Sequence, residues 1–152
     1  MSAQILIVED ERLVARELEM RVGKLGHVVS GTAATADDAV RLARERTPDL
    51  ALMDIRLRGQ RDGIEAAMAL QEQLGVSVIF LTAHGDPDSV QRARRVAPLG
   101  YLLKPLKEGE LAVVLDVALD RVRAMRQARD RERWLASMLD ALSDAVFATD
   151  VV

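Results

Sequence analysis

Four short apolar runs in this chain are followed by residues that can bind a metal ion or a phosphoryl group. The residues that follow the four runs are Glu9 with Asp10, then Asp54, Thr82 and Lys104. If the runs form parallel strands, the residues that follow them meet at one edge of a sheet. Three carboxylates at one edge repel one another unless a cation lies between them, and oxygen ligands with room for water suit Mg²⁺. The spacing therefore predicts a magnesium site.

The same residues could carry phosphoryl chemistry. A carboxylate such as Asp54 can act as a nucleophile toward phosphorus, as in the aspartyl-phosphate ATPases. Lys104 would bind phosphoryl oxygens as a point charge, and Thr82 would donate its hydroxyl to them. Each residue alone is more often a helix cap or a solvated loop group. A suitable residue after each of four strands favours one shared site over separate ordinary roles.

The elements that must position these residues alternate along the chain. Continuous apolar runs predict buried strands at 4–8, 50–53, 78–81 and 100–103, and a more polar run predicts an edge strand at 27–32. Helical periodicity lies at 11–25, 36–46 and 63–74, with Thr35 as an N-cap. Asp86 and Pro87 predict the start of a further helix. Strands that alternate with helices predict an α/β fold with an open, doubly wound, five-stranded parallel sheet.

A long C-terminal helix is predicted over about 107–142. No glycine or proline follows Gly109. Apolar residues have heptad-like spacing in two stretches, which are Leu111, Leu115, Ala118, Val122 and Met125, and then Leu135, Met138, Leu139 and Leu142. Because the second stretch lies beyond the domain core, we expect it to pair with a second copy in a parallel homodimer. Ser143 and Asp144 are expected to end the helix, and residues 145–150 to begin another strand.

Composition excludes several classes of protein. The 152 residues carry a formal net charge of -3 and include no cysteine, which excludes disulfides and thiolate metal sites. No apolar run approaches the roughly 20 residues of a membrane span, and the N-terminus does not resemble a signal peptide. The arginines between 121 and 133 are diluted by acidic residues and predict a solvated helical face. We therefore expect a cytoplasmic protein without membrane or direct nucleic-acid contact.

Four segments together closely resemble the receiver domains of two-component response regulators. The segments are ILIVEDE, LALMDIRL, IFLTAH and YLLKP, and the resemblance covers residues 3–123. It implies a flavodoxin-like sheet of order 2-1-3-4-5. It also implies that Asp54 takes a phosphoryl group from the phosphohistidine of a histidine kinase or phosphotransfer protein. The outcome would be a change of conformation or dimerisation that controls a C-terminal sensor or output region.

The resemblance also implies roles for the other site residues. Glu9 and Asp10 are similar to the acidic pair that organises Mg²⁺, with Asp54 and the backbone carbonyl of Arg56 completing the protein ligands. Thr82 and Lys104 resemble the family's phosphate-sensing pair, and Tyr101 resembles its switch aromatic. Lys104-Pro105 resembles the family's cis peptide. Lys107 departs from the pattern, since many relatives carry a helix-capping Asp or Ser there, and this leaves the start of the last helix open.

A second resemblance lies at the C-terminal end. Residues 131–150 are similar to the lead-in helix and first strand of a PAS sensor domain. The expected organisation is a receiver domain at 1–123, a helical connector at 124–142 and the start of a PAS-like domain at 143–152. An ordinary coiled-coil tail is the alternative.

Two other functions are consistent with part of this pattern. Phosphatases of the haloacid dehalogenase kind also use an aspartate nucleophile, but they need a second Asp two residues later, where this chain has Arg56. A purely structural dimeriser would leave the acidic residues without a role. We therefore expect a receiver module that phosphorylates only itself, with a histidine kinase or another output enzyme as options for the full-length protein.

Overall fold

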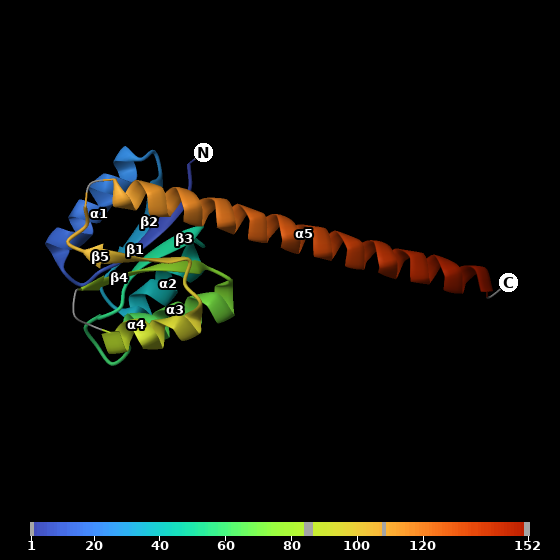
Figure 1. Cartoon of the computed structure of the whole chain (residues 1–152). Coiled ribbons are helices and arrows are strands. Elements are labelled where there is room, and N and C mark those ends of the chain that lie inside the picture. The colour runs from blue at the N-terminus through green and yellow to red at the C-terminus, as the bar shows by residue number, and fades with distance from the viewer. Residues whose placement is uncertain (1, 84–86, 108, 151–152) are drawn as a thin grey trace. The chain divides into compact units, whose positions relative to one another are not determined.

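The fold is taken from a computed structural model, which describes residues 2–83, 87–107 and 109–150. Five strands alternate with helices along the chain (Figure 1). In chain order the elements are β1 (Gln4–Val8), α1 (Arg12–Lys24), β2 (Val28–Ala33), α2 (Ala36–Glu45), β3 (Leu50–Asp54), α3 (Gly63–Leu74), β4 (Ser77–Ala83), α4 (Pro87–Ala93), the 3₁₀ turn η1 (Arg94–Val96), β5 (Gly100–Lys104) and α5 (Glu110–Asp150).

The strands form one parallel sheet in the order β2-β1-β3-β4-β5. This confirms the predicted doubly wound sheet with a long C-terminal helix. The middle strand, β3, is buried at every residue, as expected for a continuous apolar run that is covered on both faces. The more polar β2 lies at the edge and leaves Val28 exposed, which confirms its prediction as an edge strand.

Strand side chains alternate between two covered faces of the sheet. On one face Leu6, Met53 and Phe80 belong to an apolar cluster shared with α2, α3 and α4. Ile7 and Leu52, which alternate with them, are also fully buried, and Figure 1 shows α1 on the side of the sheet away from α3 and α4. Full burial of side chains of this size stabilises the fold by roughly 1.5–3 kcal/mol each. The sheet is thus a rigid frame for the residues at its carboxyl edge.

Side-chain caps fix the starts of two helices. The Thr35 hydroxyl accepts a hydrogen bond from the Asp38 N–H at 3.2 Å, which confirms the predicted cap of α2. Asp62 caps α3 in the same way by accepting from the Glu65 N–H at 3.0 Å, a cap that was not predicted. Asp86, the predicted cap of α4, lies outside the described residues.

Helix α5 differs from its prediction at both ends. It begins at Glu110 rather than 107, directly after Gly109, which has a φ of 88°. It continues through Ser143 and Asp144 to Asp150, so the predicted helix end and the predicted strand at 145–150 are wrong. Ser and Asp cost a helix less than about 0.7 kcal/mol each, and a strand would need a neighbouring strand to satisfy its backbone. The helix satisfies those groups locally.

The chain divides into two compact units, Met1–Leu119 and Asp120–Val152. The second unit consists of the continuation of α5, on which several large apolar side chains are exposed, namely Trp134, Leu135, Met138, Leu139 and Leu142. Within the described ranges, no helix has the length and apolar character that crossing a bilayer requires.

Candidate functional site

Three carboxylates meet at the carboxyl edge of the sheet, as the sequence predicts. Glu9 and Asp10 directly follow β1, and Asp54 ends the neighbouring strand β3. Each offers an oxygen, and these oxygens all lie within 4.8 Å of one another. Glu9 and Asp54 are buried, whereas Asp10 is half-buried. We refer to Glu9, Asp10 and Asp54 as the acidic centre.

Lys104 reaches the acidic centre from the last residue of β5. Its ammonium donates to Glu9 Oε2 at 2.7 Å and to Asp54 Oδ2 at 2.6 Å. Charge-assisted hydrogen bonds of this length are about twice as strong as neutral ones. Lys104 therefore balances one charge of the centre, but two carboxylates would remain without a counter-charge from it.

The pKa values of Glu9 and Lys104 reflect burial and the close approach of charged groups. Burial raises the pKa of Glu9 to about 7, and the neighbouring Asp54 carboxylate adds to the rise while Lys104 opposes it. Burial alone would lower the pKa of Lys104, but its hydrogen bonds to Asp54 and Glu9 raise it above its ordinary value. Lys104 therefore stays charged at neutral pH. A hard divalent cation would stabilise the charged form of Glu9, and so the donor set fits Mg²⁺.

Both oxygens of Asp54 have hydrogen-bond partners. Oδ2 accepts from Lys104, and Oδ1 accepts from the Arg56 N–H at 3.1 Å. This second bond places the main chain of Arg56, the predicted source of a carbonyl ligand, beside the acidic centre. Glu9 Oε1 accepts from the Glu11 N–H at 3.2 Å, which orients that carboxylate.

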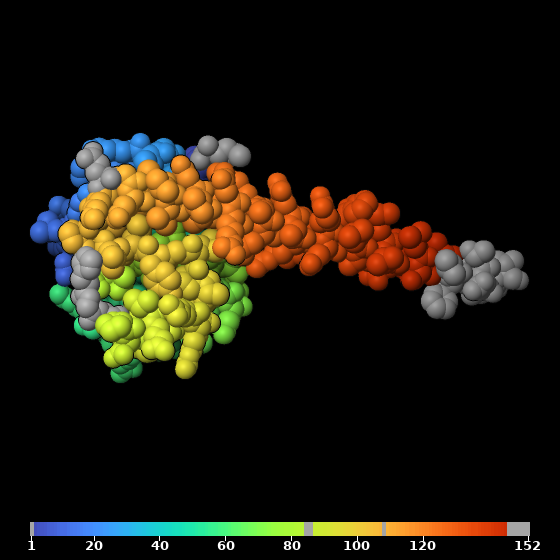
Figure 2. All heavy atoms as spheres, viewed as in Figure 1, coloured from blue at the N-terminus to red at the C-terminus, as the bar shows by residue number. Residues whose placement is uncertain are grey.

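The predicted switch residues lie on the two neighbouring strands. Thr82, on β4, is buried, and its hydroxyl donates a long hydrogen bond of 3.4 Å to the Ala83 carbonyl. Tyr101, on β5, is 36% exposed, and its ring centroid lies 6.2 Å from that of Phe80. In the view of Figure 2, α4, β5 and the first turns of α5 form one continuous surface. The Tyr101 side chain is thus partly exposed at this surface, while its ring lies near that of Phe80.

Several contacts of the site were not predicted. Arg58, in the loop after β3, forms an ion pair with Asp10 at 3.5 Å. Gly63, the first residue of α3, packs directly on the main chain of Asp54. The available sequence signal for Gly63 was its place between Asp62, which can cap a helix, and the helical pattern that follows it. Arg58 gave no signal, because a charged loop residue is ordinarily solvated.

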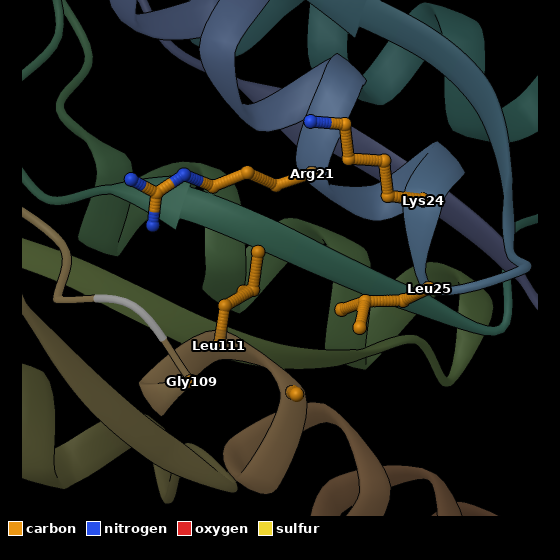
Figure 3. A pocket seen from close by; sticks show the side chains of 6 residues that line it. Arg21, Lys24, Leu25, Gly109 and Leu111 are labelled. Atoms are coloured by element: carbon orange, nitrogen blue, oxygen red, sulfur yellow. The ribbon is translucent and has the colours of Figure 1, made fainter.

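Two pockets adjoin the acidic centre or Lys104, and a third pocket lies apart from them. One pocket of about 330 Å³ is lined by Glu9 and Asp10 together with residues of α1 and β2, and gives the centre access to solvent. A second, of about 300 Å³, is lined by Lys104. A third, of about 400 Å³, lies between the end of α1 and the start of α5, where Figure 3 shows Leu25 and Leu111 between the two helices. This third pocket has no residue of the acidic centre.

Comparison with known proteins decides the family. The model of the response regulator receiver domain matches residues 5–116. The chain belongs to this family. Receiver domains are phosphoacceptors rather than enzymes, they bind Mg²⁺ at an acidic site, and they interact with histidine kinases or phosphotransfer proteins.

Individual relatives agree with this. The chain is 31% identical over 137 residues to the transcriptional regulatory protein PdtaR of Mycobacterium tuberculosis. The aligned region covers 90% of the chain and 66% of PdtaR. It is 38% identical to the receiver domain of a modulated diguanylate cyclase from Desulfovibrio desulfuricans G20, with a TM-score of 0.78 over 82% of the chain and 99% of that structure.

A third relative is the N-terminal domain of a response regulator/sensory box/GGDEF 3-domain protein from Carboxydothermus hydrogenoformans. It is 37% identical, with a TM-score of 0.73 over 80% of the chain and 97% of that structure. The chain thus matches these two solved structures over nearly their whole length, whereas it spans only part of PdtaR.

Proposed function

We propose that this receiver domain takes a phosphoryl group from a phosphohistidine onto Asp54 and thereby controls a C-terminal sensor or output region. The observation that carries the proposal is the position of Asp54, whose carboxylate lies close to those of Glu9 and Asp10 and accepts a hydrogen bond from the Lys104 ammonium at 2.6 Å. A histidine kinase or a phosphotransfer protein would supply the phosphoryl group in a cytoplasmic setting.

In the proposed reaction an Asp54 oxygen attacks phosphorus. The new O–P bond forms as the P–N bond of the phosphohistidine breaks, and the imidazole leaves with the electron pair. Lys104 would exchange its hydrogen bond to Asp54 for one to a phosphoryl oxygen. Glu9, Asp10, Asp54 and the Arg56 carbonyl would hold Mg²⁺, which when bound offsets charge between the carboxylate and phosphoryl oxygens.

The proposed switch involves Thr82 and Tyr101. The hydrogen bond from the Thr82 hydroxyl to the Ala83 carbonyl is long, at 3.4 Å, so a phosphoryl oxygen on Asp54 would be a better acceptor. Movement of Thr82 toward that oxygen leaves space that Tyr101 can enter from its half-exposed position. The phosphoryl group would thus favour one arrangement of the surface that contains β5.

Assembly and output belong to the same proposal. We propose that the exposed side chains of Leu135, Leu139 and Leu142 pair with those of a second copy in a parallel dimer. The proposed organisation is a receiver at 1–123, a connector at 124–142 and the start of a PAS-like sensor at 143–152. Its support is the sequence resemblance of the lead-in helix, since the expected first strand at 145–150 is helical, and the similarity to the N-terminal domain of the Carboxydothermus protein, whose description includes a sensory box.

Intact-mass measurement tests the chemical core of the proposal. The chain is treated with acetyl phosphate in the presence and absence of Mg²⁺. We expect one phosphoryl group to be added in a Mg²⁺-dependent way, and Asp54→Asn to abolish the addition. Asp116→Asn, which changes an exposed carboxylate of α5, is the matched control and should behave as wild type. Equal incorporation in Asp54→Asn and wild type would refute the assignment.

A further inference from the structure

Gly63, the first residue of α3, lies against the main chain of Asp54. Its N–H donates to the Ile55 carbonyl at 2.8 Å. A Cβ atom on residue 63 would lie 1.9 Å from the Asp54 carbonyl oxygen, 2.8 Å from its carbonyl carbon and 3.0 Å from Ile55 Cα. These are backbone atoms, so no side-chain rotation relieves the overlap. Any residue other than glycine would force the main chain apart at this point.

The two sides of this contact differ in how readily they can move. Asp54 is held in the sheet, where it pairs with Leu81 of β4, and the next N–H, that of Ile55, donates to the Leu81 carbonyl at 3.1 Å. Gly63 follows a loop, residues 55–62, in which the Arg58 side chain is 80% exposed. An added methyl group would therefore displace the loop and the start of α3 rather than the strand.

The displaced loop carries a contact to the acidic centre. The Arg56 N–H donates to Asp54 Oδ1 at 3.1 Å, and this bond keeps the main chain of Arg56 beside the carboxylate. The bonds from Lys104 to Glu9 and Asp54 come from β5 and do not depend on the loop. Movement of the loop would thus affect one side of the centre and leave the other side in place.

We infer that Gly63 is a positioning residue, which allows the start of α3 to hold the 55–62 loop and the main chain of Arg56 against Asp54. This inference rests on the proposed function, because the loop matters only if the acidic centre binds Mg²⁺ and takes a phosphoryl group. The requirement at residue 63 is one of space, since Gly63 is not among the glycines with a positive φ.

Gly63→Ala tests the inference, with Gly23→Ala as the matched control. Gly23 lies within α1, and apart from its chain neighbours and the backbone of its own helix no described atom lies within 4 Å of its would-be Cβ, so alanine fits there. The measurement is the Mg²⁺ concentration that gives half-maximal phosphorylation by acetyl phosphate, followed by intact mass. We expect Gly63→Ala to raise it roughly tenfold to a hundredfold, as is usual when the groups that support metal ligands are displaced. Saturating Mg²⁺ should restore most of the phosphorylation, and Gly23→Ala should match wild type.

An unchanged Mg²⁺ requirement in Gly63→Ala would overturn the inference, even if its melting temperature were lower, because a merely structural role lowers stability alone. If circular dichroism shows that Gly63→Ala does not fold, Asp62→Ala replaces it. That variant removes the cap of α3 and the 2.9 Å ion pair to Arg92 without creating an overlap. It should raise the Mg²⁺ requirement by a smaller factor, and no change would overturn the inference. Wild-type protein that shows no Mg²⁺-dependent phosphorylation would instead contradict the proposed function.

Discussion

Glu9→Gln should change how the stability of the metal-free protein depends on pH. Burial raises the pKa of Glu9 from 4.5 to about 7 in the folded protein. The folded state therefore holds the Glu9 proton at pH values where the unfolded chain has lost it. The contribution of Glu9 to stability is complete below about pH 4.5 and is lost as the pH rises through about 7.

The size of the effect follows from the rise in pKa. One pKa unit corresponds to 1.36 kcal/mol, so the difference between 4.5 and about 7 amounts to about 3 kcal/mol. Glutamine keeps the shape of Glu9 and can still accept from the Glu11 N–H, but it has no charge to bury. Glu9→Gln should therefore gain about 3 kcal/mol relative to wild type between pH 5 and pH 8 in the absence of metal.

Urea unfolding followed by circular dichroism, in a chelator, measures this difference. Glu72→Gln, which changes an exposed carboxylate of α3, is the matched control and should run parallel to wild type. Saturating Mg²⁺ should reduce the fall in wild-type stability with pH, because the cation stabilises the charged form of Glu9. A constant difference between Glu9→Gln and wild type from pH 5 to pH 8 would refute the reasoning.

Three further predictions concern the metal, the switch and the dimer. Mg²⁺ should raise the melting temperature of wild type, and Asp10→Asn should remove most of that gain; a gain that survives in Asp10→Asn would argue against this site. Thr82→Ala should still be phosphorylated but lose the effect of phosphorylation on partner binding, so unchanged phosphorylation-dependent binding in a pull-down with the cognate partner would contradict the switch. Sedimentation should show a dimer for the whole chain and a monomer for a chain shortened to end at Arg123, since burial of Leu135, Leu139 and their neighbours is worth roughly 1.5–3 kcal/mol each. Monomers at high micromolar concentration in both phosphorylation states of the whole chain would exclude the dimer.

The strand and helix pattern of the first unit could be predicted because each local signal agrees with the tertiary structure. The apolar run that contains Leu52 is a strand buried on both faces, and Thr35 caps α2 as its sequence position indicates. The edge position of β2 could be predicted from its polar residues. The carboxyl edge follows from the parallel topology, which brings Glu9, Asp54 and Lys104 together although they are far apart in sequence.

The failures have physical causes. The helical preference of residues 145–150 exceeds their strand signal when no neighbouring strand pairs with them, so α5 continues to Asp150. The position of Gly63 after Asp62 was a local signal, but its role depends on the distance between α3 and the end of β3, which tertiary packing sets. The ion pair between Arg58 and Asp10 depends on the path of a loop, which the sequence does not specify.

Direct location of the phosphoryl group tests whether Asp54 is the phosphoacceptor. The chain is phosphorylated with acetyl phosphate and Mg²⁺ and then reduced with borohydride, which converts an aspartyl phosphate to homoserine. Peptide mass spectrometry then identifies the converted residue. We predict homoserine at position 54 and at no other aspartate, with none formed when Mg²⁺ is left out. Homoserine at another position with Asp54 unchanged would contradict the account.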